Sequence, residues 1–163
     1  MKVIKTYHPY DTDLFRKWTR LEGFTMEFEV TVPSHLILSG HVNLKHRGLC
    51  AGAVGFALCI SVKSSETKEA LGPFPNTWIG DPSGHYLFGS KTGGNIASID
   101  DHYAYPTLDG YKLLQPGWHR VEVWGVSHSD AAPNTDGLIE VLADASHAES
   151  GTYNQLIAQI ISA

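Results

Sequence analysis

From Phe24 to Val32 the chain reads Phe-Thr-Met-Glu-Phe-Glu-Val-Thr-Val, and this segment indicates the fold class. Large apolar side chains occupy every second position, and threonine or glutamate occupies each position between them. Because successive side chains of a β-strand point to opposite faces, this alternation predicts a strand with one buried face and one face in water. Such strands are typical of antiparallel sheets that pack on a core through one side.

The same period of two recurs further along the chain. It predicts strands over 36–44, 50–62, 118–127, 138–142 and 153–161. Turns rich in glycine and proline, such as Gln115-Pro116-Gly117, separate these segments. Strands do not alternate with long helical patterns, which excludes α/β architectures. The 163 residues suit one domain, so we expect an all-β chain that folds as an antiparallel β-sandwich.

Residues 11–22 carry a different pattern, with apolar side chains at the spacing of one helical stripe. The stripe consists of Leu14, Phe15, Trp18 and Leu21. Asp11 or Asp13 could cap such a helix, and Gly23 could end it. We therefore expect a short helical arm within residues 1–23, which docks on a partner through the stripe, and a sandwich domain over residues 24–163.

Charged residues make up 18% of the chain, below the roughly 25% typical of soluble proteins. A small monomer needs a charged surface, so this deficit predicts that other subunits cover part of it. The 12 lysines and arginines, set against 17 acidic residues, form no basic run, which argues against a nucleic-acid partner. We also expect no membrane partner, since no apolar stretch approaches the roughly 20 residues that span a bilayer. Residues 1–9 lack the apolar region of a signal peptide, which predicts assembly in the cytoplasm.

Two predicted strands have unusual outer faces. In the strand over 50–62, large residues alternate with small ones that carry almost no charge. The terminal strand over 153–161 is apolar on both faces. Since a face in water would normally carry polar side chains, we expect the small-residue face of the first strand to contact either the opposite sheet or a neighbouring subunit, and the terminal strand to be covered on both sides. The predicted subunit interface consists of Ala53, Gly55, Ala57, Leu156, Ile157 and Ile160.

The sequence offers little for catalysis. It contains no recognisable nucleophile motif and no metal-binding motif, so we expect no enzymatic activity, no cofactor and no bound metal. Aromatic and acidic side chains gather in the loop-rich segment that includes Trp78, Tyr86, Asp101 and Tyr103. Aromatic rings beside carboxylates are suited to binding sugars, so this group is a candidate ligand site. The same aromatic residues could instead pack the long loops onto the sandwich.

The segment Tyr-Lys-Leu-Leu-Gln-Pro-Gly-Trp-His-Arg-Val-Glu-Val-Trp-Gly over 111–125 resembles the strand, Pro-Gly turn and strand of trimeric jelly rolls of the tumour necrosis factor-like kind. The final strand over 154–161 fits the buried last strand of those folds. Similar jelly rolls occur on phage particles as capsid decoration proteins, head fibres and the tips of tail fibres and tailspikes.

This resemblance implies a homotrimeric jelly roll on a virion surface, assembled in the host cytoplasm. The first expectation is a capsid decoration (cement) protein that holds a capsid or tail scaffold protein and stabilises the shell. The alternative is a tip module of a tail fibre or tailspike that binds a host surface glycan or receptor.

Overall fold

The computed structural model describes residues 1–15, 18–46, 52–62, 69–70, 95–96, 102–104, 107–129, 139–143 and 154–163. These residues form strands that pair antiparallel throughout, with a single short helical turn, η1 (Glu22–Phe24), among them. The prediction of an all-β chain with antiparallel sheets is therefore confirmed. None of the described residues belongs to a helix with the length and apolar character that crossing a bilayer requires.

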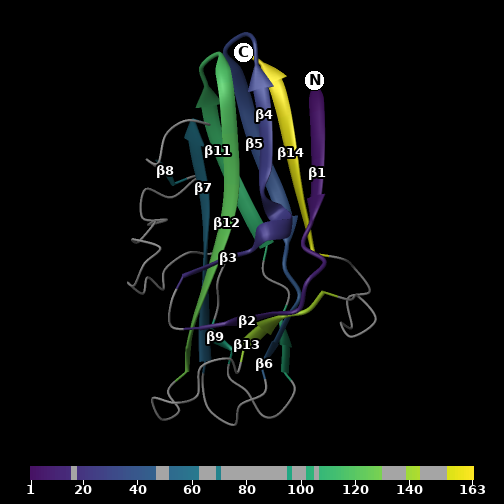
Figure 1. Ribbon diagram of the computed structural model, residues 1–163, viewed down its shortest axis with the longest axis vertical. Coiled ribbons are helices and arrows are strands. Elements are labelled where there is room, and N and C mark those ends of the chain that lie inside the picture. Colours follow the sequence, from purple (N-terminus) through teal and green to yellow (C-terminus); the bar gives the residue numbers. More distant parts are fainter. Residues whose placement is uncertain are drawn as a thin grey trace.

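One layer of the structure is sheet A, with the strand order β1-β14-β5-β11. Its strands are β1 (Lys2–Tyr7), β14 (Gln155–Ser162), β5 (Ser34–His41) and β11 (Thr107–Leu114). The two ends of the chain are thus neighbours, because Lys2 lies opposite Ile160 in the ladder between β1 and β14. Both termini lie at the same end of the molecule (Figure 1).

The facing layer is sheet C, with the strand order β3-β12-β7-β8. Its strands are β3 (Thr19–Arg20), β12 (Gly117–Ser129), β7 (Gly52–Val62) and β8 (Glu69–Ala70), with β4 (Met26–Val30) paired to β12 and β9 (Asn95–Ile96) paired to β7. The strand β4 follows the alternation of the sequence, since its apolar residues are buried and Glu27 and Glu29 are exposed.

A smaller sheet B lies at the end of the molecule away from the two termini (Figure 1). Its order is β10 (His102–Ala104), β6 (Leu44–His46), β13 (Ile139–Val141) and β2 (Thr12–Leu14). Because β1 leads into β2 and β5 leads into β6, two strands of sheet A continue into sheet B. The backbone changes partners between the two sheets, around Val42 and Asn43.

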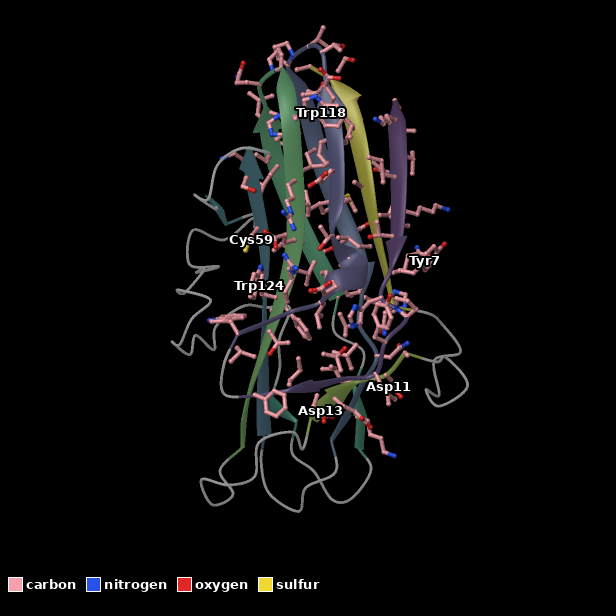
Figure 2. The ribbon with its side chains drawn as sticks, viewed as in Figure 1. Tyr7, Asp11, Asp13, Cys59, Trp118 and Trp124 are labelled. Atoms are coloured by element: carbon pink, nitrogen blue, oxygen red, sulfur yellow. The ribbon has the colours of Figure 1, made fainter. Side chains whose placement is uncertain are left out.

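The main core fills the space between the sheets with apolar side chains that the described strands turn inward. Its largest fully buried members are Phe24, Phe28, Phe56, Leu14, Leu21, Leu36, Leu38, Leu44, Leu58 and Leu108. A second, smaller cluster consists of Trp18, Cys59 and Val126, with Trp124 packed against it. Figure 2 shows Cys59 and Trp124 on the neighbouring strands β7 and β12.

The helical arm predicted from residues 11–22 is wrong. Residues 12–14 and 19–20 are short strands that pair with β13 and β12, respectively. Leu14 and Leu21 belong to the main core, and Trp18 belongs to the second cluster. These three side chains are buried within their own chain and cannot dock on a partner, whereas Phe15 is 42% exposed. Pairing with distant strands outweighs the local helical pattern.

Residues 2–20 contribute one strand to each of the three sheets. They pair with β14, β13 and β12, which all lie in the last third of the sequence. The predicted division at residue 23 therefore does not separate an arm from the sandwich.

Candidate functional site

The outer face of sheet A is a candidate interaction surface. The register of the ladders places its outward-pointing residues in rows across the sheet. The row nearest the termini contains Ile161, His35 and Leu113, and the next contains Val3, Gln159, Ile37 and Tyr111. Five of these side chains, those of Ile161, Leu113, Val3, Ile37 and Tyr111, are large, apolar or aromatic, and exposed. We call these two rows the apolar face.

Contacts within the apolar face hold its aromatic residues in place. The Nδ1 atom of His35 lies 2.9 Å from the hydroxyl oxygen of Tyr111, and their rings stack with centroids 5.9 Å apart. Tyr111 nevertheless remains 51% exposed, and its ladder partner Ile37 is 38% exposed. A contiguous apolar patch that is not covered within its own chain is typical of protein–protein contact sites.

The row beside the apolar face carries charged and polar side chains. It contains Lys5, Ile157, Ser39 and Asp109 in order across the sheet. Lys5 lies on the edge strand β1, and Asp109 lies on the opposite edge strand β11. Sheet A therefore carries charges of opposite sign on its two edges at the same level.

The structure separates the six residues predicted to form a subunit interface. Leu156 and Ile160 point into the main core and are buried within the chain, so their prediction as interface residues is wrong. Ile157 points to the outer side and is half-buried. The backbones of Ala53, Gly55 and Ala57 lie in β7, paired with His128, Val126 and Trp124, but only the backbone is described at these positions.

A second candidate site is a pocket of about 470 Å³ beside the turn η1, lined by His8, Tyr10, Thr12, Arg20, Glu22 and Gly23. A smaller pocket of about 300 Å³ adjoins it and shares His8 as a wall. Gly23 allows this arrangement, since a Cβ atom at this position would clash with the Tyr7 carbonyl oxygen and with the Cα atom of His8. The backbone after β1 therefore lies directly against the turn.

His8 is held in a defined state between the two pockets. Its Nδ1 accepts a hydrogen bond from the Gly23 N–H over 3.1 Å, so the ring proton of the neutral imidazole lies on Nε2. Nε2 then donates to Thr12 Oγ1 over 2.7 Å, and the Thr12 hydroxyl donates to the Tyr10 carbonyl oxygen. Burial lowers the pKa of His8 to about 4, although the nearby Glu22 charge acts in the opposite direction.

This buried histidine predicts a pH-dependent stability. Between pH 6.5 and about 4 the unfolded chain binds a proton at His8 and the folded chain does not, so stability falls as the pH falls through this window. We expect His8 to account for a loss of roughly 2 kcal/mol after allowance for solvent screening. The measurement is the free energy of urea unfolding against pH for the unmodified protein and for His8→Gln, which cannot take up the proton. Equal slopes for the two proteins would contradict the assignment.

A network of charged side chains extends from Arg20 and Glu22 in the wall of the larger pocket to Glu122 and Arg120 outside its lining. Arg20 donates to Glu22 over 2.9 Å and to Glu122 over 3.2 Å, and Arg120 lies 4.0 Å from Glu122. The hydrogen bond from Arg20 lowers the pKa of Glu22 below its usual range. Glu22 is therefore a carboxylate at neutral pH, and its side chain is 68% exposed at the pocket rim.

The ligand-binding residues predicted from sequence fall outside these sites. Trp78, Tyr86 and Asp101 lie outside the described residues, and for Tyr103 only the backbone is described, in β10 opposite Lys45. Their role stays a prediction. Within the described residues, no group of three or more His, Cys, Asp or Glu side chains comes together as a metal site.

Sequence reasoning missed both sites that the structure reveals. The apolar face combines residues from both ends of the chain with residues from two internal strands, and His35 and Tyr111 are 76 positions apart. One local signal was present, because Ile37 is an apolar residue among the polar residues His35, Ser39 and His41 on one face of its strand. The pocket gave no comparable signal, since Tyr10, Arg20 and Glu22 form no spaced motif.

No protein-family model matches the chain, and no curated protein matches it. Among solved structures, the chain is similar to that of Eiger TNF from S. frugiperda, with 9% sequence identity and a TM-score of 0.45. This alignment covers 100% of the present chain and 96% of the other. A likeness at this level assigns no role to any residue of this chain.

Proposed function

We propose that this chain is a non-enzymatic structural protein that assembles as a homotrimer through the outer face of sheet A. The observation that carries the proposal is the apolar face, in which Val3, Ile37, Tyr111, Leu113 and Ile161 lie together and exposed. The low charged fraction of 18% supports it, because a surface that is covered by other copies needs fewer charges to stay soluble.

The occupant that fits the apolar face best is a further copy of the same chain. In a cyclic assembly whose axis runs parallel to the strands, rotation leaves each row of sheet A at the same height. Lys5 of one copy then lies level with Asp109 of the next, and the edges that approach carry opposite charges. Three copies is the number that the sequence resemblance to trimeric jelly rolls implies.

The strand orders support a sandwich of jelly-roll type. Sheet A combines the first and last long strands with two internal strands, and sheet C combines β4, β12 and β7. Consecutive long strands alternate between the layers, as β4 to β5, β5 to β7 and β11 to β12 do. Crossing connections of this kind between two antiparallel sheets characterise jelly rolls, which recur in viral capsid proteins.

The proposed setting is the surface of a virus particle, where the trimer acts as a capsid decoration protein and binds a shell or tail scaffold protein. The support for this setting is the sequence resemblance to phage surface jelly rolls. Phe15, the exposed member of the predicted docking stripe, lies at the end of β2 and remains available to such a partner.

The proposal is tested by hydroxyl-radical labelling at a series of protein concentrations. We expect oxidation of Tyr111 to fall several-fold from nanomolar to micromolar concentration, because neighbouring copies cover its ring. Tyr10, which is 59% exposed outside sheet A, serves as the internal control and should label equally at every concentration. Equal labelling of Tyr111 throughout the series would contradict assembly through this face.

A further inference from the structure

We propose that the pocket beside the turn η1 is a binding site for a neutral saccharide. The inference does not depend on the proposed assembly, because the pocket lies outside the apolar face and is complete within one chain. Its volume of about 470 Å³ falls within the range of small-molecule sites, roughly 300–1,000 Å³, and leaves room for one or two sugar rings.

The pocket offers the two kinds of contact that a sugar ring needs. The Tyr10 ring is exposed at the rim and gives an apolar surface on which the C–H face of a sugar can stack. The Glu22 carboxylate and the Arg20 guanidinium lie in the same lining and supply acceptors and donors for sugar hydroxyl groups. A mostly apolar cavity with a few placed polar groups is the usual form of such sites.

The charges of the pocket select a ligand without net charge. Arg20 and Glu22 neutralise each other across 2.9 Å, and a second carboxylate, Glu122, lies 3.2 Å from Arg20. An anionic ligand would have to compete with both carboxylates for the guanidinium of Arg20. A cationic ligand would have to compete with Arg20 for the carboxylates. Hydroxyl groups can instead bond to Arg20 and Glu22 together without disturbing their ion pair.

The His8 wall of the pocket is held in place before any ligand binds. Both ring nitrogens of His8 are hydrogen-bonded, and its ring stacks on the buried Phe24 with centroids 5.6 Å apart. The Tyr10 ring meets the His8 ring edge to face at the same centroid distance of 5.6 Å. A site with ordered walls loses little conformational entropy on binding, which favours recognition of a small polar ligand.

The test is saturation-transfer NMR on the full chain with glucose, galactose, mannose, N-acetylglucosamine and their common disaccharides. We expect at least one of these sugars to bind with a Kd of about 1 mM or lower. Tyr10→Ala should weaken that sugar at least about 10-fold, whereas Tyr10→Phe keeps the ring and should retain binding. Glu22→Gln should weaken it as well, and Glu29→Gln on the outer face of sheet C is the matched control that should not. Tyr10, Glu22 and Glu29 are all exposed, so the variants should fold.

Three outcomes would overturn the inference. One is the absence of saturation transfer to every neutral sugar at tens of millimolar. Another is binding that survives both Tyr10→Ala and Glu22→Gln, which would place the sugar elsewhere on the chain. The third is binding of a sialic acid in preference to every neutral sugar, which would contradict the charge argument. None of these outcomes affects the proposed assembly, which labelling of Tyr111 tests separately.

Discussion

Replacing Ile37 by lysine is expected to separate the proposed homotrimer into monomers. Ile37 lies on β5 with Gln159 and Tyr111 as its neighbours in the two flanking strands, so it occupies the middle of the apolar face. A lysine at this position would place three unpaired ammonium groups in the interior of a trimer. We expect self-association to weaken at least about 100-fold, which corresponds to ~3 kcal/mol. Sedimentation equilibrium at micromolar concentration measures this change.

Phe15→Lys is the matched control for this variant. Phe15 is exposed to a similar extent as Ile37, at 42% against 38%, but it follows β2 in sheet B rather than lying on sheet A. It should leave the mass in solution unchanged. Urea unfolding of both variants checks that the sandwich is intact, because an exposed position should tolerate lysine with little loss of stability. An Ile37→Lys protein of unchanged mass would contradict the assignment of this face.

Replacing Asn154 by alanine is expected to cause the largest loss of stability among single changes outside the apolar core. Asn154 is buried where strands of sheet A give way to those of sheet B. Its Oδ1 accepts the Asn43 N–H over 2.7 Å, and its Nδ2 donates to the carbonyl oxygens of His8 and Leu142. One side chain thus satisfies backbone groups from three distant segments.

Alanine at position 154 would leave these backbone groups buried without partners. We expect the free energy of urea unfolding to fall by about 3 kcal/mol, from the lost hydrogen bonds and the buried groups left unpaired. The adjacent substitution Gln155→Ala is the control, because Gln155 is only half-buried on the outer face and should change stability by no more than about 0.5 kcal/mol. If Asn154→Ala lowers the free energy of unfolding as little as Gln155→Ala does, Asn154 does not hold the strands together where sheet A gives way to sheet B.

The layers of the fold could be predicted from sequence because each long strand carries its own alternation. Residues 24–32 and 118–127 needed no distant information, and the structure places strands there as β4 and β12. The alternation also identified Leu36 and Leu38 as core residues of β5. No such alternation identified the strand β1, because none of its residues is fully buried.

The conformation of the short segments could not be predicted from the sequence. Leu14, Trp18 and Leu21 have the spacing of a helical stripe, yet they belong to two separate clusters. Leu14 lies on β2, whereas Trp18 and Leu21 lie directly before and after β3. A strand of three residues is too short to show a period of its own. Its conformation depends on pairing with β13, which is far away in the sequence.

The two faces of a strand could be separated from sequence, but the side that meets the core could not always be assigned. In the terminal strand both faces are apolar, and the structure buries Leu156, Ala158 and Ile160 while turning Ile157 and Ile161 outward. The strand surface that we expect a partner to cover is therefore the outer face of sheet A. The register of four strands, which defines the apolar face, depends on contacts that no local pattern reports.

The mass of the unmodified chain in solution, measured by sedimentation equilibrium, shows whether copies of the chain associate through sheet A. We expect a species of three 17.8 kDa chains at micromolar concentration, which dissociates on dilution. A single-chain mass at every concentration up to the millimolar range would mean that the exposed side chains of sheet A face water, and it would contradict self-assembly through that sheet.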